Sequence, residues 1–262
     1  MSVQVLVAAM HRTDHSILEE MNLQSDAIII NQCDRNEFDK LEYREHEILF
    51  YSFNERGVGL SRNTALMRAT KDICLFADED MIYVDGYADV IQNEFIKNPK
   101  ADVIIFSVNS LNEDKPLSVI KENKRVRRKE AMRYGSARIA FRRDRIIDKN
   151  ILFSLLFGGG AKYSSGEDTI FLQDCLKKGL KIYKSTVKIA DIKQEESTWF
   201  NGYSEKLFFD KGVLLATVMP RIANFYALGL SYKYSKNKSV EMSFWNIWTA
   251  MKKGVNSKKK KR

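Results

Sequence analysis

Three consecutive carboxylates follow an apolar run that reads as a buried strand. The segment "CLFADEDM" covers residues 74–81 and contains Asp78, Glu79 and Asp80. Like charges this close repel one another unless a positive charge neutralises them. No basic residue lies directly beside them in the sequence, so a divalent cation is the first candidate. Asp78 and Asp80 carry the oxygen ligands that Mg²⁺ or Mn²⁺ prefers, usually together with substrate phosphates. A solvated turn or a helix N-cap is the alternative interpretation.

A glycine pair opens the second candidate segment, "RGVGLSRNTALMRAT", at residues 56–70. Gly57 and Gly59 would let backbone N–H groups approach a phosphate at a helix start, with Arg62 one turn into the helix. The Rossmann fingerprint is incomplete because Arg62 stands in place of its third glycine, and no Walker A motif is present. Close packing at a helix entry is the alternative role for the two glycines.

The third segment, "GGGAKYSSGEDTIF", covers residues 158–171 and places Glu167 and Asp168 in the first turn of a predicted helix. Its glycines and serines predict a mobile loop. A mobile loop beside two carboxylates suits a lid and a general base. Stabilisation of acids by the helix dipole is a sufficient structural alternative.

Short apolar strands alternate with helical patterns along the first half of the chain. The predicted strands are 3–9, 26–32, 47–53, 72–77, 101–108, 136–143 and 180–190, and the predicted helices are 14–22, 58–70, 84–97 and 167–179. This order predicts an α/β fold with a mostly parallel, Rossmann-like sheet flanked by helices. Ligands bind at the carboxyl ends of such strands, where the candidate acids lie.

The chain after residue 200 has a different, helical pattern that Pro220 interrupts. We therefore predict a catalytic domain at 1–200 and a C-terminal helical segment with a basic tail at 201–262. Phe244, Trp248, Met251 and Val255 share one face of a predicted helix. An aromatic face followed by lysines suits the surface of an anionic bilayer. Packing of that face on the catalytic domain is the alternative.

Composition limits the class of protein. The chain has 262 residues, of which 44% are hydrophobic, enough for a sizeable core. Its net charge is +9, and the last eleven residues hold seven basic side chains and no acid, which leaves +2 for residues 1–251. Three dispersed cysteines suggest neither a disulfide framework nor a zinc site. Since no signal peptide and no long apolar run appear, we expect a cytoplasmic protein that meets a membrane only from its surface.

The order and spacing of "RGVGLSRN", "CLFADED" and "FGGGAKYSSGEDTIFLQDCLKKG" resemble those of the family 2 glycosyltransferases of the GT-A fold. The bacterial enzymes of capsule, exopolysaccharide or lipopolysaccharide synthesis are the most similar in pattern. The resemblance covers about residues 3–200. It implies a nucleotide-diphosphate sugar donor, usually UDP-linked, a Mn²⁺ or Mg²⁺ ion, and inversion at the anomeric carbon. It also implies a saccharide or lipid-linked acceptor, which favours the membrane interpretation of the C-terminal helix.

The resemblance also assigns roles at the donor site. Asp78 and Asp80 correspond to the ends of the D-x-D motif, with Asp80 as the direct metal ligand, Asp78 facing the ribose or donor sugar, and Glu79 between them. Asp34 corresponds to the acid that hydrogen-bonds uracil, and Arg62 to a helix residue near the nucleotide. Ala8, Ala9 and His11 line the base from the first loop, although an ordinary loop histidine is the favoured interpretation of His11. The sequence departs from the family at "NQCDRN", where "DDGS" is usual.

Asp168 corresponds to the general base of the family's E-D motif, with Glu167 as its partner. On a helix, Asp168 lies one turn before Leu172, on the side that Phe171 and Cys175 define as buried. A late histidine metal ligand, found in some GT-A enzymes, is absent, because no histidine follows His46.

The sequence thus predicts an inverting glycosyltransferase of surface polysaccharide synthesis. Two alternatives stay open. A metal-dependent sugar nucleotidyltransferase would use a similar sheet, but its glycine-rich basic loop is missing from "AAMHRTDHS" after the first strand. A basic nucleic-acid-binding protein would explain the aromatic and lysine-rich C-terminus, but it leaves both acidic motifs without a role, so we expect no nucleic-acid partner.

Overall fold

The computed structural model describes residues 1–113, 117–194 and 202–259. The predicted domain boundary at residue 200 lies outside these described residues. The strands are β1 Val3–Met10, β2 Asp26–Gln32, β3 Glu37–Tyr43, β4 His46–Phe53, β5 Ile73–Asp78, β6 Met81–Tyr83, β7 Val103–Ser110, β8 Lys124–Arg125, β9 Ile139–Arg142 and β10 Ile182–Ile192. The helices are α1 Ile17–Glu20, α2 Val58–Arg68, α3 Tyr87–Lys97, α4 Arg128–Ala131, α5 Arg143–Asp148, α6 Glu167–Lys177, α7 Glu205–Val218, α8 Ala223–Ser235 and α9 Phe244–Lys259, with a 3₁₀ turn at Ser136–Arg138.

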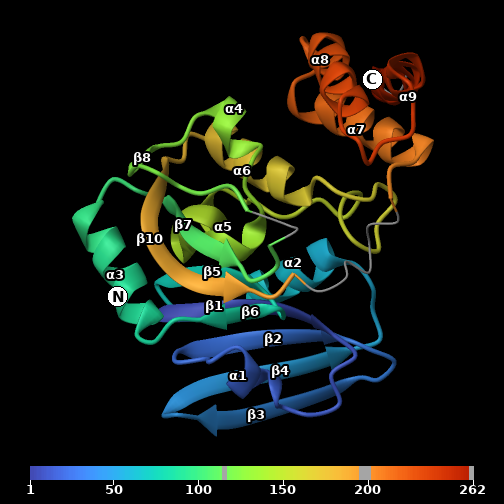
Figure 1. The fold of residues 1–262 in the computed structure, drawn as a ribbon. Coiled ribbons are helices and arrows are strands. Elements are labelled where there is room, and N and C mark those ends of the chain that lie inside the picture. Colours follow the sequence, from blue (N-terminus) through green and yellow to red (C-terminus); the bar gives the residue numbers. More distant parts are fainter. Residues whose placement is uncertain (114–116, 195–201, 260–262) are drawn as a thin grey trace.

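The strands form one twisted sheet, which Figure 1 shows as the centre of the molecule. Within the described residues its order is β3-β4-β2-β1-β5-β9-β7-β10-β6, and β8 pairs with β10. Strands β1, β2, β4, β5, β7 and β10 run in the same direction, whereas the other four run opposite to them. The prediction of a mostly parallel α/β sheet is confirmed. The parallel block β4-β2-β1-β5 brings the carboxyl ends of four strands to one edge.

Helices cover both faces of the sheet because its strands are apolar on both sides. In β1 the buried side chains alternate, with Val5 and Val7 in one core and Leu6 in the other. The first core receives α1 and α3, for example through Ile91. The second core receives α2, α5 and α6, for example through Phe171. This is the three-layer arrangement that the alternation of strands and helices predicts.

The edge strand β3 is absent from the prediction. It pairs antiparallel with β4 through a two-residue turn at Arg44 and Glu45, whose φ angles are +50° and +65°. Such turns usually carry Asn-Gly or Asp-Gly, because those residues tolerate positive φ. Arg44 and Glu45 give no such signal. The predicted strand at 136–143 is shorter than expected, since residues 136–138 form the 3₁₀ turn. Within the predicted helix at 14–22, only the four residues of α1 are helical.

The C-terminal helices α7, α8 and α9 form a bundle with its own core, visible at the upper right of Figure 1. Met251 and Val255 are fully buried there, so part of the predicted apolar face of α9 packs against the chain. A Cβ at Gly212 would lie 2.1 Å from the carbonyl oxygen of Met251, and one at Gly254 would lie 2.1 Å from that of Phe209. Helices α7 and α9 therefore touch backbone to backbone.

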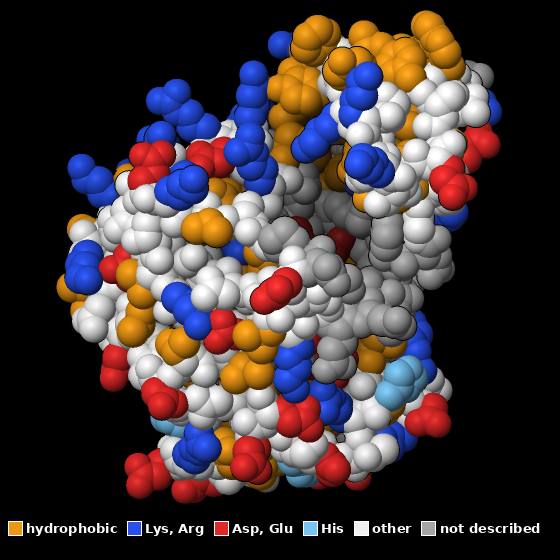
Figure 2. Space-filling view, in the orientation of Figure 1, with side chains coloured by type: hydrophobic (Ala, Val, Ile, Leu, Met, Phe, Trp, Pro, Cys, Tyr) orange, Lys and Arg blue, Asp and Glu red, His pale blue; other side chains and the backbone are white. Residues whose placement is uncertain are grey.

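Apolar side chains remain exposed on the outer side of this bundle, where Figure 2 shows them gathered at the top. Phe225 is 77% exposed, Trp245 69% and Tyr232 61%. Phe225, Leu228 and Tyr232 follow one another at helical spacing on α8. We call this set, with Trp245, the outer apolar face. Across the described residues, the helices are all too short or too polar to traverse a bilayer.

Candidate active site

The carboxyl ends of β1, β2 and β5 bring the predicted donor residues to one edge. Ala8 pairs in register with Asp78, and the N–H of His11 donates to the carbonyl oxygen of Gln32 at 3.0 Å. Asp34 is exposed in the turn after β2. The side chain of Ala9 packs in the first core, so only its backbone can meet a ligand. These residues share the sheet edge at which an α/β protein binds its ligand.

The glycines at the start of α2 are explained by packing. A Cβ at Gly59 would lie 2.9 Å from the carbonyl oxygen of Ser154, so only glycine fits there. The N–H of Gly57 donates to Gln32 Oε1 at 2.6 Å, and that of Val58 donates to the carbonyl oxygen of Gly159 at 3.0 Å. Because these N–H groups are already bonded within the protein, the packing interpretation is favoured over a phosphate-binding helix start.

Helix α2 carries Arg62 to the centre of the site, where three carboxylates surround it. Arg62 Nη2 donates to Asp78 Oδ1 at 2.7 Å, and Nη1 donates to Asp168 Oδ1 at 3.0 Å and to Glu167 Oε1 at 3.2 Å. Only 3% of the arginine side chain is exposed. Burial acts to lower the pKa of Arg62, but the charges of the three acids outweigh it and raise the pKa. Arg62 therefore joins the end of β5 to the start of α6.

This position changes the role expected of Arg62. Its two terminal nitrogens face the carboxylates, and the guanidinium lies over the Phe153 ring at 5.3 Å from the ring centre. A buried group with these partners holds the acids in place. We therefore propose that Arg62 is a positioning residue, in place of the nucleotide contact that the resemblance implies.

Glu79 also has a basic partner. Arg12 Nε donates to Glu79 Oε2 at 2.8 Å, and its Nη1 donates to Glu20 Oε2 at 2.8 Å. The sequence places no basic residue beside the triplet, but the fold brings one to Asp78 and one to Glu79. The two arginines are distant in sequence and reach the triplet through the fold.

Asp80 differs from its two neighbours. Within the described part of the chain it forms no ion pair, and burial together with the nearby charge of Asp78 raises the pKa of Asp80 to about 6. A carboxylate held near other acids without a counter-charge is a fitting ligand for a hard cation. Asp80 and Asp78 thus offer an oxygen donor set suited to Mg²⁺ or Mn²⁺. The described residues contain no cluster of three or more His, Cys, Asp or Glu ligands, so substrate phosphates or water would complete the coordination.

The acidic pair at the start of α6 has two distinct environments. Glu167 is 12% exposed, and its Oε2 accepts the N–H of Gly166 at 3.0 Å. Asp168 is 23% exposed and lines the pocket described below, whereas Glu167 does not line it. Burial and the charge of Glu167 raise the pKa of Asp168 to about 7, against the opposing charge of Arg62. Phe171, Leu172 and Cys175 are buried as predicted.

The glycine-rich loop before α6 forms a hydrogen-bonded turn. The N–H of Gly158 donates to the carbonyl oxygen of Tyr163 at 2.9 Å, and the N–H of Ser164 donates to Asp210 Oδ2 at 3.0 Å. A Cβ at Gly158 would lie 2.9 Å from Glu167 Cδ. The loop therefore packs directly against Glu167. The sequence predicts a lid for this segment, and this supporting contact is not part of that prediction.

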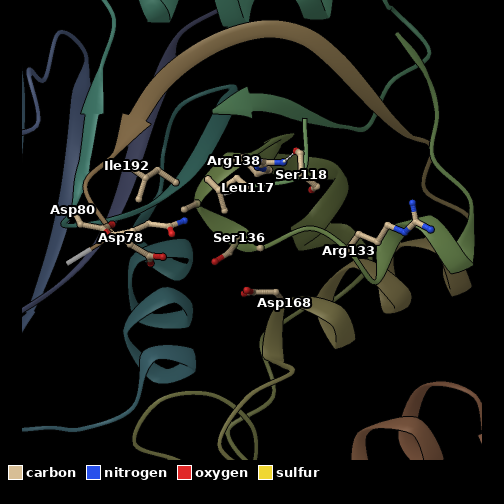
Figure 3. Close-up of a pocket in the computed structure, with 12 residues that line it drawn as sticks. Asp78, Asp80, Leu117, Ser118, Arg133, Ser136, Arg138, Asp168 and Ile192 are labelled. Carbon is tan, nitrogen blue, oxygen red and sulfur yellow. Dashed lines mark hydrogen bonds between the residues drawn. The ribbon is translucent and has the colours of Figure 1, made fainter. Parts of the chain in front are cut away.

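A pocket of about 470 Å³ opens beside these groups. Figure 3 shows Asp78 and Asp80 at one end, Arg133 at the other, and Asp168 with Ser136 between them. Carboxylates thus line one part of the pocket and basic or hydroxyl side chains another. A substrate group bound between the two ends of the pocket would lie next to Asp168.

The second half of this pocket is lined by residues that are not among the predicted site residues. Ser118, Arg133, Ser136 and Arg138 all contribute to its lining. Arg138 precedes the apolar run of β9 in "SARIAF", and a charged residue at the edge of a buried strand is the signal that would have revealed it. Arg133 and the two serines lie in polar loop sequence and give no comparable signal.

Comparison with solved structures confirms the fold class. TarS of S. aureus, residues 1–349 in complex with UDP-GlcNAc, matches over 97% of this chain and 82% of the TarS chain, with a TM-score of 0.66 and 17% identity. The same TarS segment in complex with UDP matches with a TM-score of 0.61 and 15% identity over 98% and 83% of the two chains. The longer TarS structure matches over 98% of this chain but 50% of its own. No protein-family model and no curated protein matches the sequence. The chain therefore shares the GT-A-type α/β fold of TarS.

Replacing Arg62 by Met should destabilise the protein by roughly 3 kcal/mol, because three carboxylates lose their shared counter-charge. The loss should be larger at about pH 8 than at about pH 5, since Asp168, with its pKa raised to about 7, is neutral at the lower pH. Urea unfolding at both pH values measures this. Arg68→Met, an exposed position on the same helix, is the matched control. An equal loss at both pH values would show that Arg62 does not act through Asp168.

Proposed function

We propose that this protein is a glycosyltransferase that transfers a sugar from a nucleotide-diphosphate sugar, with UDP as the nucleotide, to a saccharide or lipid-linked saccharide acceptor in surface polysaccharide synthesis. One observation carries the proposal: Asp168, with a pKa raised to about 7, faces the same pocket as Asp78 and Asp80. The shared fold of TarS, a glycosyltransferase that binds UDP-GlcNAc, supports the donor class.

The donor would lie along the sheet edge. Asp34 and His11 stand where the uracil is expected, and Ala8 lies beside Asp78. Asp80 and Asp78 would hold Mn²⁺ or Mg²⁺. When bound, the ion acts as a Lewis acid that offsets the charge developing on the leaving diphosphate.

Asp168 is suited to the base that the reaction requires. The acceptor hydroxyl loses its proton to Asp168 as its oxygen attacks the anomeric carbon, and the bond from that carbon to the diphosphate oxygen breaks. A base works best when its pKa is close to the working pH, and burial moves Asp168 into that range. Glu167 is fixed by Gly166 and Arg62 and keeps the start of α6 in place.

The placement of these groups supports our proposal of inversion at the anomeric carbon. Asp78 and Asp80 lie at one end of the pocket, where the leaving diphosphate would be held, and Asp168 lies further along it. An acceptor activated at Asp168 therefore approaches the sugar from the side opposite the leaving group. A single in-line displacement then inverts the configuration.

A metal-dependent sugar nucleotidyltransferase is the competing class. It also needs a cation and a nucleotide site, but it attacks phosphorus and releases pyrophosphate. The raised pKa of Asp168 favours activation of a sugar hydroxyl, which needs a base. Incubation with Mn²⁺ and a panel of nucleotide sugars separates the two, because a glycosyltransferase releases UDP and a nucleotidyltransferase releases pyrophosphate.

We also propose that the protein works in the cytoplasm at the inner face of the cell membrane. The outer apolar face of α8 and Trp245 is exposed, and Lys236 lies over the Tyr232 ring at 5.4 Å from its centre. Aromatic side chains next to lysines are typical of surfaces that enter the headgroup region of an anionic bilayer. The bundle buries the side of α9 that carries Met251 and Val255. The outer apolar face is therefore the proposed membrane contact in its place.

Asp80→Asn should abolish metal-dependent UDP binding and leave the fold intact, because a partly exposed loop carboxylate adds little packing energy. Calorimetry with UDP and Mn²⁺ measures the binding. Asp191→Asn, at the carboxyl end of β10 and paired only with Lys188 among the described residues, is the matched control. Unchanged metal-dependent binding in folded Asp80→Asn would remove Asp80 from the metal site.

Asp168→Asn should lower turnover by about 10²–10⁴-fold with little change in donor binding, because a base acts mainly in the transition state. Glu167→Gln should lower it less. The wild-type rate should fall as the pH drops below about 7, since Asp168 becomes protonated. Release of UDP at a series of pH values measures all three. An inactive Glu167→Gln beside an active Asp168→Asn would exchange the two roles.

Replacing Phe225 and Leu228 together by Ser should weaken binding to vesicles with anionic lipid by about tenfold or more, because two apolar side chains no longer enter the bilayer. Added salt should weaken wild-type binding through screening. Vesicle sedimentation measures both effects. The matched control replaces Met67 on α2 and Ile96 on α3 by Ser. These two side chains are 66% and 61% exposed. Equal loss in both double variants would argue against the outer apolar face as the contact.

A further inference from the structure

One buried cation in the pocket, Arg138, forms no ion pair with any residue that the structure describes. Arg138 is 5% exposed, and its Nη1 donates to the carbonyl oxygen of Ser118 at 3.2 Å. Its Nη2 is buried and has no hydrogen-bond partner among the residues that the structure describes. The guanidinium lies 5.9 Å from the centre of the Tyr134 ring, its nearest ring contact. Arginine stays charged under all physiological conditions, so the positive charge of Arg138 is present and unneutralised.

Arg138 contrasts with Arg62, the other buried arginine of the site. Arg62 faces three carboxylates. A buried charge without a partner costs several kcal/mol. The side chain of Arg138 lines the pocket, so a group bound in the pocket would lie next to its charge. The planar fork of a guanidinium fits a carboxylate or a phosphate with two parallel hydrogen bonds.

A basic surface continues outward from this part of the pocket. Arg127, Arg128, Lys129 and Arg133 are exposed, and we call them the basic rim. None of the four forms an ion pair in the described part of the chain, and the nearby Glu130 is engaged by Lys184 at 2.6 Å. Figure 2 shows Lys and Arg side chains gathered over α4 and β8. Arg133 belongs both to the rim and to the pocket lining, so the rim begins at the pocket.

We propose that the acceptor is an anionic glycan, whose carboxylate or phosphate group next to the reactive hydroxyl binds Arg138 and whose following charges lie along the basic rim. The inference rests on the proposed function, since it names the acceptor class for that site. Asp168 lies between the donor end at Asp78 and the Arg133 end of the pocket, so a hydroxyl near Arg138 can reach the base. Carboxylates at the donor end repel an anionic acceptor, and the charge of Arg138 thus selects its orientation.

Calorimetry of the full chain with UDP and Mn²⁺ present tests the proposal with three probes of equal length. These are tetragalacturonate, a glycerol phosphate tetramer and neutral maltotetraose. We expect one acidic tetramer to bind at least about tenfold more tightly than maltotetraose, because charged hydrogen bonds add that much. The tighter of the two acidic tetramers identifies carboxylate or phosphate as the recognised group. Added salt should weaken its binding.

Variants locate the binding to the predicted residues. Arg138→Gln and Arg133→Gln should each weaken binding of the acidic tetramer by about tenfold and leave UDP binding unchanged. Arg138→Lys should restore part of the loss, since it keeps the charge but not the fork. Arg221→Gln, an exposed arginine between α7 and α8 of the C-terminal bundle, is the matched control and should bind normally. If Arg138→Gln does not fold, the double variant Arg127→Gln and Arg133→Gln, both exposed, carries the test.

Three outcomes would overturn the proposal. The first is that the acidic tetramers bind no better than maltotetraose, and the second is that the arginine variants bind them as the wild type does. The third is a loss of UDP binding in Arg138→Gln, which would assign Arg138 to the donor site. Failure of the wild-type protein to bind UDP, with arginine-dependent binding of the acidic tetramer retained, would instead reject the proposed function and keep the anion site.

Discussion

The buried ion cluster of Arg62 determines how the rest of the site is built. Asp78 at the end of β5 and the acids at the start of α6 belong to elements that would repel one another, and Arg62 binds all of them. Its helix must therefore lie very close to the loop at Phe153, which is why a glycine stands at position 59. One side chain thus holds the end of β5, the proposed donor end, close to Asp168, the proposed base.

The arginines distribute charge unevenly over the acids, and this unevenness gives each acid a different chemistry. Arg12 neutralises Glu79, and Arg62 is shared among three carboxylates. Asp80 is left for a cation, and Asp168 has its pKa raised to about 7 by burial. The five nearby carboxylates therefore have different environments, which fit their proposed roles as anchors, a metal ligand and a base.

The sequence predicts those features that depend on local patterns. The strands, the helix at Glu167 and the buried position of Phe171 follow from periodicity, and the order of acidic motifs located one half of the pocket. The partners of the acids were hidden because Arg62 lies 16 residues from Asp78 and 105 from Glu167. The hairpin of β3 was hidden because Arg44 and Glu45 occupy a turn that usually needs glycine or asparagine. The sequence marks Arg138 only by its place before the apolar run of β9, and its lack of an ion pair within the described residues is visible only in three dimensions.

The C-terminal bundle is joined to the site by a buried acid. Asp210 on α7 is 2% exposed, and its carboxylate accepts the N–H of Ser164 in the loop that supports Glu167. A Cβ at Gly166 would lie 2.7 Å from the side chain of Leu214, so the same helix also shapes the residue before the acidic pair. The bundle is thus not an exchangeable module. A chimera that takes these helices from a related enzyme would need the matching loop 158–166 as well. A recombination event that exchanges the bundle would therefore have to break the gene upstream of that loop.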